Sequence, residues 1–546
     1  MSNYKSLLCL ALGAGLLASC YEDKGNYEYR TDIHDISVKL KGLHEVHKKH
    51  EKMSYTLTPE VTTVDGDKSK LEYLWLWLKP SGVMDTLSVE ETATLEIDPQ
   101  SPDFAERYNL RFYVTDTRTK GVTMAPTRVE LIKPYSYAWL VLHEDNGHAE
   151  LGTVEYLTEE TKVTPRAYTD EQGTSLTGKP VNLTVAKNAV EPTQWGVSTV
   201  SQVFVTTTEL AESGLMDQSN RFKLMSPWNK LVHPDQAAEI DFTKMRSAGA
   251  DEGLLICSQG KVFRNSATSP VMYRMNPGSG FTEPYAISHV INNFNVFSLG
   301  YDSIGHRFVG LNYGFQKWYG TNITTVRNAG TISTVPNKAE NAVDPGNIPA
   351  DHHIIRMLNG YRYSTANPSP NYKYAVYAYA LAPGGKSHVY VLHYYGASNA
   401  APAAGPSLPG RYTFNTPAGL TESTPMTTSP DYNNILFYAH GNKVYRLDFS
   451  TGVSSVIYTH EAADAQVVSL KMAVDGYVED KIKFGGSGTY GHPYSRCLGV
   501  GVNTADGKGE VVVLQLNTAG KVDEDKKHPS TQVYKGFGKI TQVCFI

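Results

Sequence analysis

The histidine-rich segments are the first candidates for metal chemistry in this sequence. The densest is His44-x-x-His47-x-x-His50, but this spacing does not place three side chains on one face of a strand, so we interpret it as a solvated loop. Asp351-His352-His353 could also supply ligands, although an exposed loop is the simpler interpretation. The polar run 143–148 surrounds a turn, and turn chemistry explains its residue types. The sequence therefore predicts no metal site.

The glycine-rich segment Gly486-x-Gly488-x-x-Gly491 matches a dinucleotide-binding fingerprint by its letters. The residues that follow, 492–494, read His-Pro-Tyr and cannot open the helix whose N-terminus would hold a pyrophosphate. The G-x-S-x-G motif of a nucleophile elbow does not occur in the sequence. We therefore predict no cofactor, no catalytic residue and a protein that is not an enzyme. Paired carboxylates on distant loops, as in glycoside hydrolases, remain an open alternative.

Large aromatic side chains, most of them close to a glycine, are the best candidates for ligand contact. Such rings offer a large contact area at low entropic cost, and they can stack on sugars or clamp extended peptides. The alternative is that these residues fill the protein core. The candidate ligand-binding residues are Trp195, Trp228, Trp318, Tyr319, Tyr361, Tyr363, Tyr394 and Tyr395.

The composition indicates which elements must position these residues. The chain of 546 residues contains 35 Tyr against 17 Phe, together with 46 Gly and 28 Pro. Tyrosine favours strands, whereas glycine and proline favour turns, so we expect a turn-rich all-β protein. The formal net charge is -5 and the charges are spread without long runs, which argues against a nucleic-acid partner.

Residues 34–133 have the pattern of an immunoglobulin-like β-sandwich. Short segments of strand length, such as Leu71–Leu78 and Tyr108–Asp116, alternate with turn residues. We expect Trp75 or Trp77 to be the tryptophan buried between the two sheets.

Residues 134–546 consist of repeated hairpins. Leu254–Arg264 and Leu436–Arg446 are near copies, and Asn146-Gly147 is a favoured hairpin turn. This pattern, without helical periodicity, favours a β-propeller of about seven blades, with six or eight as alternatives. The final strand, Ile540–Ile546, should pair with one from the start of the domain and close the ring. Two further β-sandwiches are the alternative architecture.

Residues 1–19 have the features of a secretory signal. Lys5 precedes an apolar stretch that is too short to span a bilayer as a helix, and Leu17-Ala18-Ser19-Cys20 closes it. Small residues before a cysteine resemble the bacterial lipobox, which implies that Cys20 is lipidated and begins the mature chain. Cleavage as an ordinary secretory signal near Ala18 is the alternative. If Cys20 is lipidated, residues 20–33 form a lipidated tether to the membrane.

Three segments together resemble the PKD-like family lipoproteins of Bacteroidota. They are the opening C-Y-E-D-K-G-N-Y at residues 20–27, the strand Tyr108–Asp116, and the W-L-V-L-H-E-x-x-G stretch at residues 139–147. The resemblance implies a surface-exposed lipoprotein of the outer membrane, with a PKD-like sandwich ahead of a propeller-like region.

The resemblance also implies partners. Members of this family are associated with SusC/SusD-like outer-membrane importers, so we expect an accessory subunit that binds an oligopeptide or oligosaccharide nutrient without cleaving it. Two alternatives stay open: a surface hydrolase or lyase built on the propeller, and a structural or adhesion lipoprotein.

Overall fold

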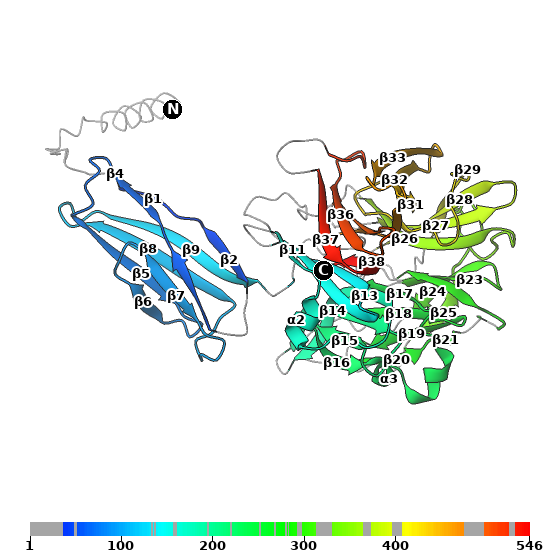
Figure 1. The fold of residues 1–546 in the computed structure, drawn as a ribbon, viewed down its shortest axis with the longest axis horizontal. Helices are drawn as coiled ribbons and strands as arrows, with labels where there is room; N and C mark the ends of the chain where they lie inside the picture. The colour runs from blue at the N-terminus through cyan, green and yellow to red at the C-terminus, as the bar shows by residue number, and fades with distance from the viewer. Residues whose placement is uncertain are drawn as a thin grey trace, which may run out of the picture. The chain divides into compact units, whose positions relative to one another are not determined.

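The computed structural model describes residues 36–546 except 48–51, 133–134, 136–137, 157–160, 194–195, 219–220, 251–252, 267–268, 279–280, 282, 292–297, 313–329, 364–372, 396–406, 474–495 and 524–529. The chain divides into two compact units, residues 1–132 and residues 133–546. Both units are built almost entirely from β-strands (Figure 1). The predicted all-β fold, a sandwich followed by a propeller, is confirmed.

The first unit is a β-sandwich. Its main sheet has five strands in the order β2 (Leu43–His47), β9 (Val122–Ile132), β8 (Arg107–Asp116), β5 (Leu71–Leu78) and β6 (Met84–Ser88). Two strand pairs complete the unit: β1 (Ile36–Lys39) with β4 (Glu60–Thr63), and β3 (Met53–Leu57) with β7 (Ala93–Ile97).

Alternation along the strands builds the core of the sandwich. Every second residue of β8 is buried from Tyr108 onward, as the period of two of a strand requires. Trp75 has no exposed surface, and its ring stacks on Phe112 with 4.5 Å between centroids. The buried tryptophan is therefore Trp75, whereas Trp77 is only partly buried. His44 lies in β2 with Nδ1 3.0 Å from the Tyr55 hydroxyl, so the predicted loop is in fact a strand at this residue.

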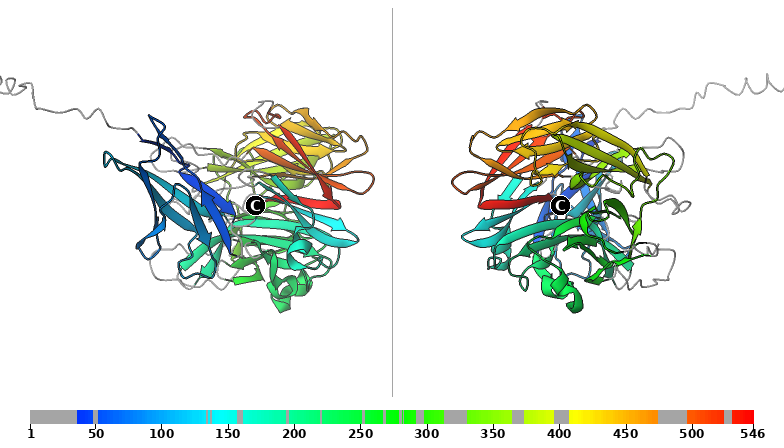
Figure 2. Two further views of the ribbon diagram at one scale, coloured as in Figure 1. Left: turned by 60° about the vertical axis from the view of Figure 1, so that its left-hand side comes forward. Right: turned by 90° about the vertical axis from the view of Figure 1, so that its right-hand side faces the viewer.

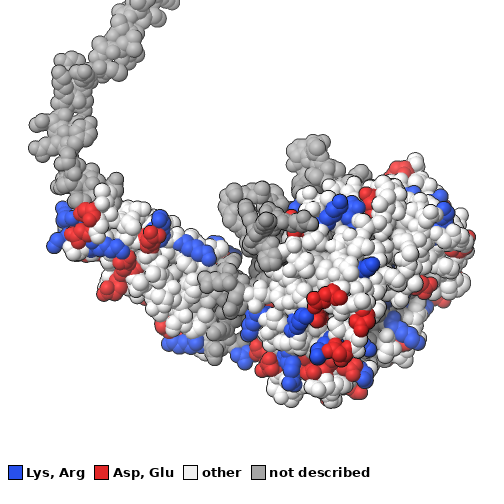
Figure 3. Space-filling model, turned by 45° about the horizontal axis from the view of Figure 1, so that its top comes forward, with Lys and Arg blue, Asp and Glu red and all other residues white. Residues whose placement is uncertain are grey.

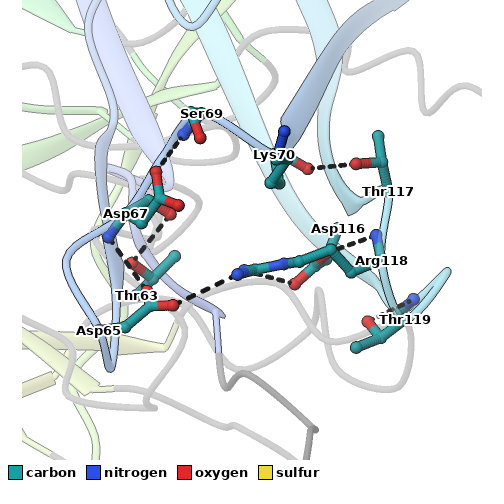
Figure 4. A network of polar contacts seen from close by, with 10 residues as sticks. Thr63, Asp65, Asp67, Ser69, Lys70, Asp116, Thr117, Arg118 and Thr119 are labelled. Atoms are coloured by element: carbon teal, nitrogen blue, oxygen red, sulfur yellow. Dashed lines mark hydrogen bonds and ion pairs between the residues drawn. The ribbon is translucent and has the colours of Figure 1, made fainter.

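A carboxylate-rich end of the sandwich is balanced by one arginine (Figure 4). The Arg118 guanidinium donates to Asp116 at 3.0 and 3.1 Å and to Asp65 at 3.3 Å. These hydrogen bonds lower the pKa of Asp116 to about 2. Since Arg118 supplies the compensating positive charge, this group of polar residues ties the β4–β5 loop to the β8–β9 turn and is not a cation site.

The second unit is a propeller of seven blades, counted over the part of residues 133–546 that the structure describes. Blade 1 contains β12 (Thr161–Thr164), β11 (His148–Tyr156), β10 (Ala138–Asp145) and β38 (Lys539–Phe545). Blade 2 contains β13 (Pro180–Thr193), β14 (Gly196–Thr207), β15 (Gly214–Asp217) and β16 (Lys223–Pro227). Blade 3 contains β17 (Arg246–Ala250), β18 (Gly253–Ser258), β19 (Lys261–Ser266) and β20 (Ser269–Arg274).

Blade 4 has an extra edge strand. It contains β22 (Ile287–Ile291), β23 (Ser298–Asp302), β24 (Arg307–Asn312), β25 (Thr331–Thr334) and the short β21 (Asn276–Pro277). Blade 5 contains β26 (His353–Tyr363), β27 (Lys373–Ala382), β28 (Lys386–Tyr395) and β29 (Ser407–Asn415). Blade 6 contains β30 (Met426–Thr427), β31 (Ile435–His440), β32 (Lys443–Asp448) and β33 (Val453–Thr459). Blade 7 contains β34 (Gln466–Met472), β35 (Cys497–Asn503), β36 (Gly509–Gln515) and β37 (Thr531–Phe537).

Each junction between neighbouring blades holds its own apolar cluster. Blades are therefore buried on both faces, and successive residues of one strand enter different clusters. In β27, Ala378 packs toward blade 4, whereas Tyr377 and Tyr379 pack toward blade 6. This arrangement explains why much of the tyrosine excess lies in strands: Tyr377, Tyr379, Tyr390 and Tyr438 are strand residues among the largest fully buried side chains.

The last strand closes the ring, as predicted. β38 pairs antiparallel with β10, from Trp139 opposite Phe545 to Glu144 opposite Lys539. It also contacts β34 of blade 7 and β13 of blade 2, so it is the innermost strand of blade 1. Figure 2 shows the C-terminal strand beside the first strands of the propeller. The Asn146-Gly147 turn has positive φ at both residues, +49° and +83°, as a type I′ turn requires.

Candidate functional site

A polar cavity of about 240 Å³ lies where the inner strands of blades 3, 4 and 5 begin. Arg246 is the first residue of β17, His289 is the third of β22, and His353 is the first of β26. The β23–β24 turn of blade 4 and the segment before β30 of blade 6 complete its wall with His306 and Glu422. We call this the entry cavity, because it lies on the face at which each inner strand enters its blade.

Polar residue types predominate in the lining of the entry cavity, although apolar atoms supply the larger part of its surface. Nine of the twelve lining residues carry a polar or charged side chain. Arg246, His353 and Glu422 are exposed, whereas His289 and Tyr301 are buried. The cavity therefore has charged groups at its mouth and neutral hydrogen-bonding groups deeper inside.

A chain of hydrogen bonds orients the first arginine. The Arg246 guanidinium donates to Nε2 of His289, and Nδ1 of His289 lies 3.0 Å from Oγ of Ser288. Because arginine can only donate, Nε2 must be the accepting nitrogen, so Nδ1 carries the proton and donates to Ser288. Ser288 in turn donates to the carbonyl of Tyr301 at 3.4 Å. Burial, and then the charges of Arg246 and Arg356, lower the pKa of His289 to about 3, so this ring is neutral at neutral pH.

A second arginine adds positive charge beside the cavity. Arg356 of β26 donates to the carbonyls of Ile355 at 2.8 Å and Thr424 at 3.3 Å. Burial and the charge of Arg246 lower its pKa to about 10, which still leaves it charged at neutral pH. Within the described part of the chain, no carboxylate forms an ion pair with Arg246 or Arg356. The charges of Arg246 and Arg356 are thus not paired with a carboxylate among the described residues.

His352 lines the blade 5 side of the cavity and stacks on His388, which lies outside the lining. The rings of His352 and His388 lie 4.1 Å apart, and Nδ1 of His352 lies 2.5 Å from the Tyr390 hydroxyl. Nδ1 of His388 lies 2.9 Å from Oγ1 of Thr413. Burial lowers the pKa of His352, and burial followed by the charge of His352 lowers that of His388 to about 4. Both rings are therefore neutral hydrogen-bonding groups rather than charges.

One buried hydroxyl of the cavity wall has no partner among the residues that the structure describes. This is the Tyr301 hydroxyl, which burial, followed by the influence of Tyr390, shifts to a pKa of about 12. A buried hydroxyl without a hydrogen bond costs about 1–3 kcal/mol relative to a satisfied one.

The structure gives the predicted aromatic residues different environments. Trp228 lies in α3 (Trp228–Leu231) with no exposed surface, packs in the cluster between blades 2 and 3, and donates its indole N–H to the Val205 carbonyl at 2.9 Å. It fills the core and offers no surface to a ligand. Tyr361 is partly buried and packs against the cluster between blades 5 and 6.

The other aromatic candidates of blade 5 share one end of the sheet. Tyr363 pairs with Lys373, which pairs with Tyr395, the last residue of β28, and Tyr394 directly precedes it. These positions lie at the end of β26, roughly 30 Å from His353 at its start. They are therefore on the propeller face opposite the entry cavity. Trp195, Trp318, Tyr319 and the lipidation residue Cys20 lie outside the described residues.

Sequence reasoning identified part of the cavity and missed the rest. Asp351-His352-His353 was considered as a set of metal ligands and interpreted as an exposed loop, whereas His352 and His353 line the cavity. Arg246 and His289 were not expected. The only available signal was Ser288-His289 inside the otherwise apolar run Ile287–Ile291, because polar residues buried in a strand need a specific partner.

Other site types were sought in the same described residues. No group of three or more His, Cys, Asp or Glu side chains is arranged to hold a metal ion there. None of the helices in that part of the chain has the length and apolar character needed to cross a membrane. Basic and acidic side chains are interspersed on the face drawn in Figure 3.

Comparison with known proteins supports the sandwich assignment. Residues 20–180 match the profile of the PKD-like family, a segment that spans the sandwich and the first three strands of the propeller. No curated protein matches the chain.

Several solved structures share a distant likeness. A quinonprotein alcohol dehydrogenase-like protein from Bacteroides thetaiotaomicron is 11% identical over 92% of this chain and 96% of its own, with a TM-score of 0.37. A DUF4784 family protein from Bacteroides caccae is 9% identical over 77% and 95%, with a TM-score of 0.23. The WD40 domain of SCAP from fission yeast is 10% identical over 86% and 94%, with a TM-score of 0.24. The number of blades rests on the strand pairing of this chain.

Proposed function

We propose that this protein is a lipoprotein of the outer membrane surface, anchored through Cys20, whose propeller binds an oligomeric nutrient for a SusC/SusD-like importer. The observation that supports ligand binding best is the entry cavity, beside which Arg246 and Arg356 have no carboxylate partner among the described residues. A bound anion would pair with these positive charges.

Binding without catalysis is the form of this proposal that fits the cavity chemistry. Ser288 and His289 are hydrogen-bonded, as a nucleophile and its base would be, but the third partner is Arg246. A nucleophilic serine needs a histidine that a carboxylate orients and whose pKa lies near the working pH. The pKa of His289 lies near 3, so this ring is a poor base at neutral pH.

The lipid anchor would increase the usefulness of moderate affinity. Several acyl carbons buried in the membrane hold a protein stably at the surface, and tethering raises the local concentration of the binding site near an importer. The acidic residues Glu22 and Asp23 directly after Cys20 fit the tether of an exported lipoprotein.

Ligand capture is tested with the chain from residue 20 onward, carrying Cys20→Ser, on a glycan array and against a peptide library. We expect retention of one ligand class with no cleavage products by mass spectrometry. Products that accumulate with time would establish the hydrolase or lyase alternative. Pull-down of an importer with no ligand on either array would instead favour a structural role. Loss of binding in Tyr394→Ala would show that the opposite face takes part, and loss of binding in Trp318→Ala would show that Trp318 contributes to ligand contact.

Anchoring and exposure are tested in intact cells. Metabolic labelling with an alkyne fatty acid should mark the protein, and the Cys20→Ala variant should lose both the label and the membrane association. External protease should then digest the labelled protein while a periplasmic control survives. Protection of the labelled protein from protease would refute the surface assignment.

A further inference from the structure

We infer that the entry cavity binds an anionic sugar residue of a glycan, with the negative charge, a carboxylate or a sulfate, held at Arg246. This inference rests on the proposed function, since it names the class of ligand that the same propeller would capture. Its basis is the charge, the hydrogen-bonding capacity and the size of the cavity.

Charge selects an anion. Arg246 is exposed, and its hydrogen bond to His289 orients the guanidinium group. Arg356 adds a second positive charge from β26, the inner strand of blade 5. The planar guanidinium matches carboxylate and sulfate oxygens with two parallel hydrogen bonds. Glu422 is the only carboxylate of the described cavity lining, and it is exposed, so water screens its opposing charge.

Hydrogen-bonding capacity selects a sugar over a peptide side chain. Pockets for apolar groups are lined mainly by hydrophobic side chains. Only Ala350, Ile354 and Ile355 are apolar residues in this lining, whereas the side chains of Ser303, His306 and His353 can form hydrogen bonds. Sugar hydroxyls need this combination of donors and acceptors.

The volume of the cavity limits the bound part of the ligand to one sugar residue. A volume of about 240 Å³ is below the usual range of roughly 300–1,000 Å³ for drug-sized ligands, so the cavity accommodates one ring with its substituent. Because the cavity opens between blades 3, 4 and 5, the rest of the glycan chain is free to extend over the entry face.

The first test compares ligands on the intact protein. Isothermal titration would use an oligogalacturonide, a sulfated oligosaccharide, a neutral galacto-oligosaccharide and a glutamate-rich peptide of similar length. We expect binding of a charged oligosaccharide that is at least tenfold tighter than binding of the neutral one, and that weakens as salt is raised. Preference for the carboxylated or for the sulfated ligand would identify the anion. Tighter binding of the neutral glycan or of the peptide would overturn the inference.

The second test uses charge variants. Arg246→Gln should weaken binding of the charged oligosaccharide about tenfold or more, because a charge-assisted hydrogen bond is lost. Glu422→Gln should strengthen it, since an opposing charge is removed. Arg221→Gln serves as the matched control, because it removes a partly exposed arginine of blade 2 that pairs with Glu171. All three positions have exposed side chains, so folding should be retained, and thermal melts would verify it.

The outcomes separate this inference from the proposed function. If a neutral glycan or a peptide binds and Arg246→Gln leaves its affinity unchanged, the anion site is refuted while nutrient capture stands. If no member of either library binds, both are refuted.

Discussion

The closing strand provides the sharpest stability prediction. Phe545 of β38 is 3% exposed, and its ring lies 4.9 Å from that of Trp139 at the junction of blades 7 and 1. The same strand accepts a hydrogen bond from the Leu183 amide of blade 2 through Gln542, and donates one to Ser469 of blade 7 from the Val543 amide. β38 therefore joins three blades that are distant in sequence.

Phe545→Ala should lower the free energy of unfolding of the propeller by about 3–5 kcal/mol, the usual effect of truncating a buried aromatic residue. That is a large part of the roughly 5–15 kcal/mol that stabilises a folded domain. Removal of residues 539–546 should abolish folding of the propeller altogether, because blades 1 and 7 would both lose apolar contacts and blade 1 would lose its inner strand.

The assay is urea unfolding, combined with hydrogen exchange read by mass spectrometry. Protection should fall first in β10 and β34, which flank the closing strand, while the sandwich is unaffected. Val453→Ala is the matched control, because Val453 is 60% exposed on the outer strand β33 and its truncation should change stability by no more than about 0.5 kcal/mol. An unfolding free energy of Phe545→Ala within 0.5 kcal/mol of the parent protein would refute the role of the closing strand.

Three further predictions concern the propeller interior. The pKa of His289 is about 6.5 in the unfolded chain and about 3 in the folded protein, so the unfolded state binds the proton more readily between these pH values. The free energy of unfolding should therefore fall as the pH drops below 6.5, by up to about 1.4 kcal/mol per pH unit. His289→Gln should flatten this dependence in urea titrations at several pH values. Gly499→Ala places a Cβ 2.3 Å from the Trp139 ring and should cost about 1–3 kcal/mol by overpacking, whereas Gly410→Ala meets nothing closer than 3.7 Å and should be near neutral in the same assay. Trp228→Ala should lower the unfolding free energy by about 3–5 kcal/mol, and ligand titration of the remaining folded protein should show unchanged affinity.

Local patterns predicted the individual strands well. The hairpin around Asn146-Gly147 and the near copies at Leu254–Arg264 and Leu436–Arg446 form paired strands as expected, because turn residues and strand alternation are local properties. The strands β4 and β6 were missed, since both are short and largely exposed and carry little apolar alternation.

The cavity was harder to predict for a physical reason. Arg246, His289 and His352 are separated by tens of residues and meet only because three inner strands begin at the same point of the ring. The aromatic pattern, by contrast, did not distinguish a core residue from a surface one. Trp228 and Tyr377 fill junctions between blades, and burial depends on which blade packs beside them.

The sequence by itself determined that this chain is built of strands, that a sandwich precedes a series of hairpins, and that the last strand returns to the first. These conclusions follow from periodicity, turn chemistry and composition, which act over a few residues. Only the tertiary structure decided which tyrosines and tryptophans are core and where two arginines lie beside one cavity with no ion pair among the described residues. Burial and charge neutralisation depend on which residues lie close together in space, and residues distant in sequence come together here only when the blades pack around the ring.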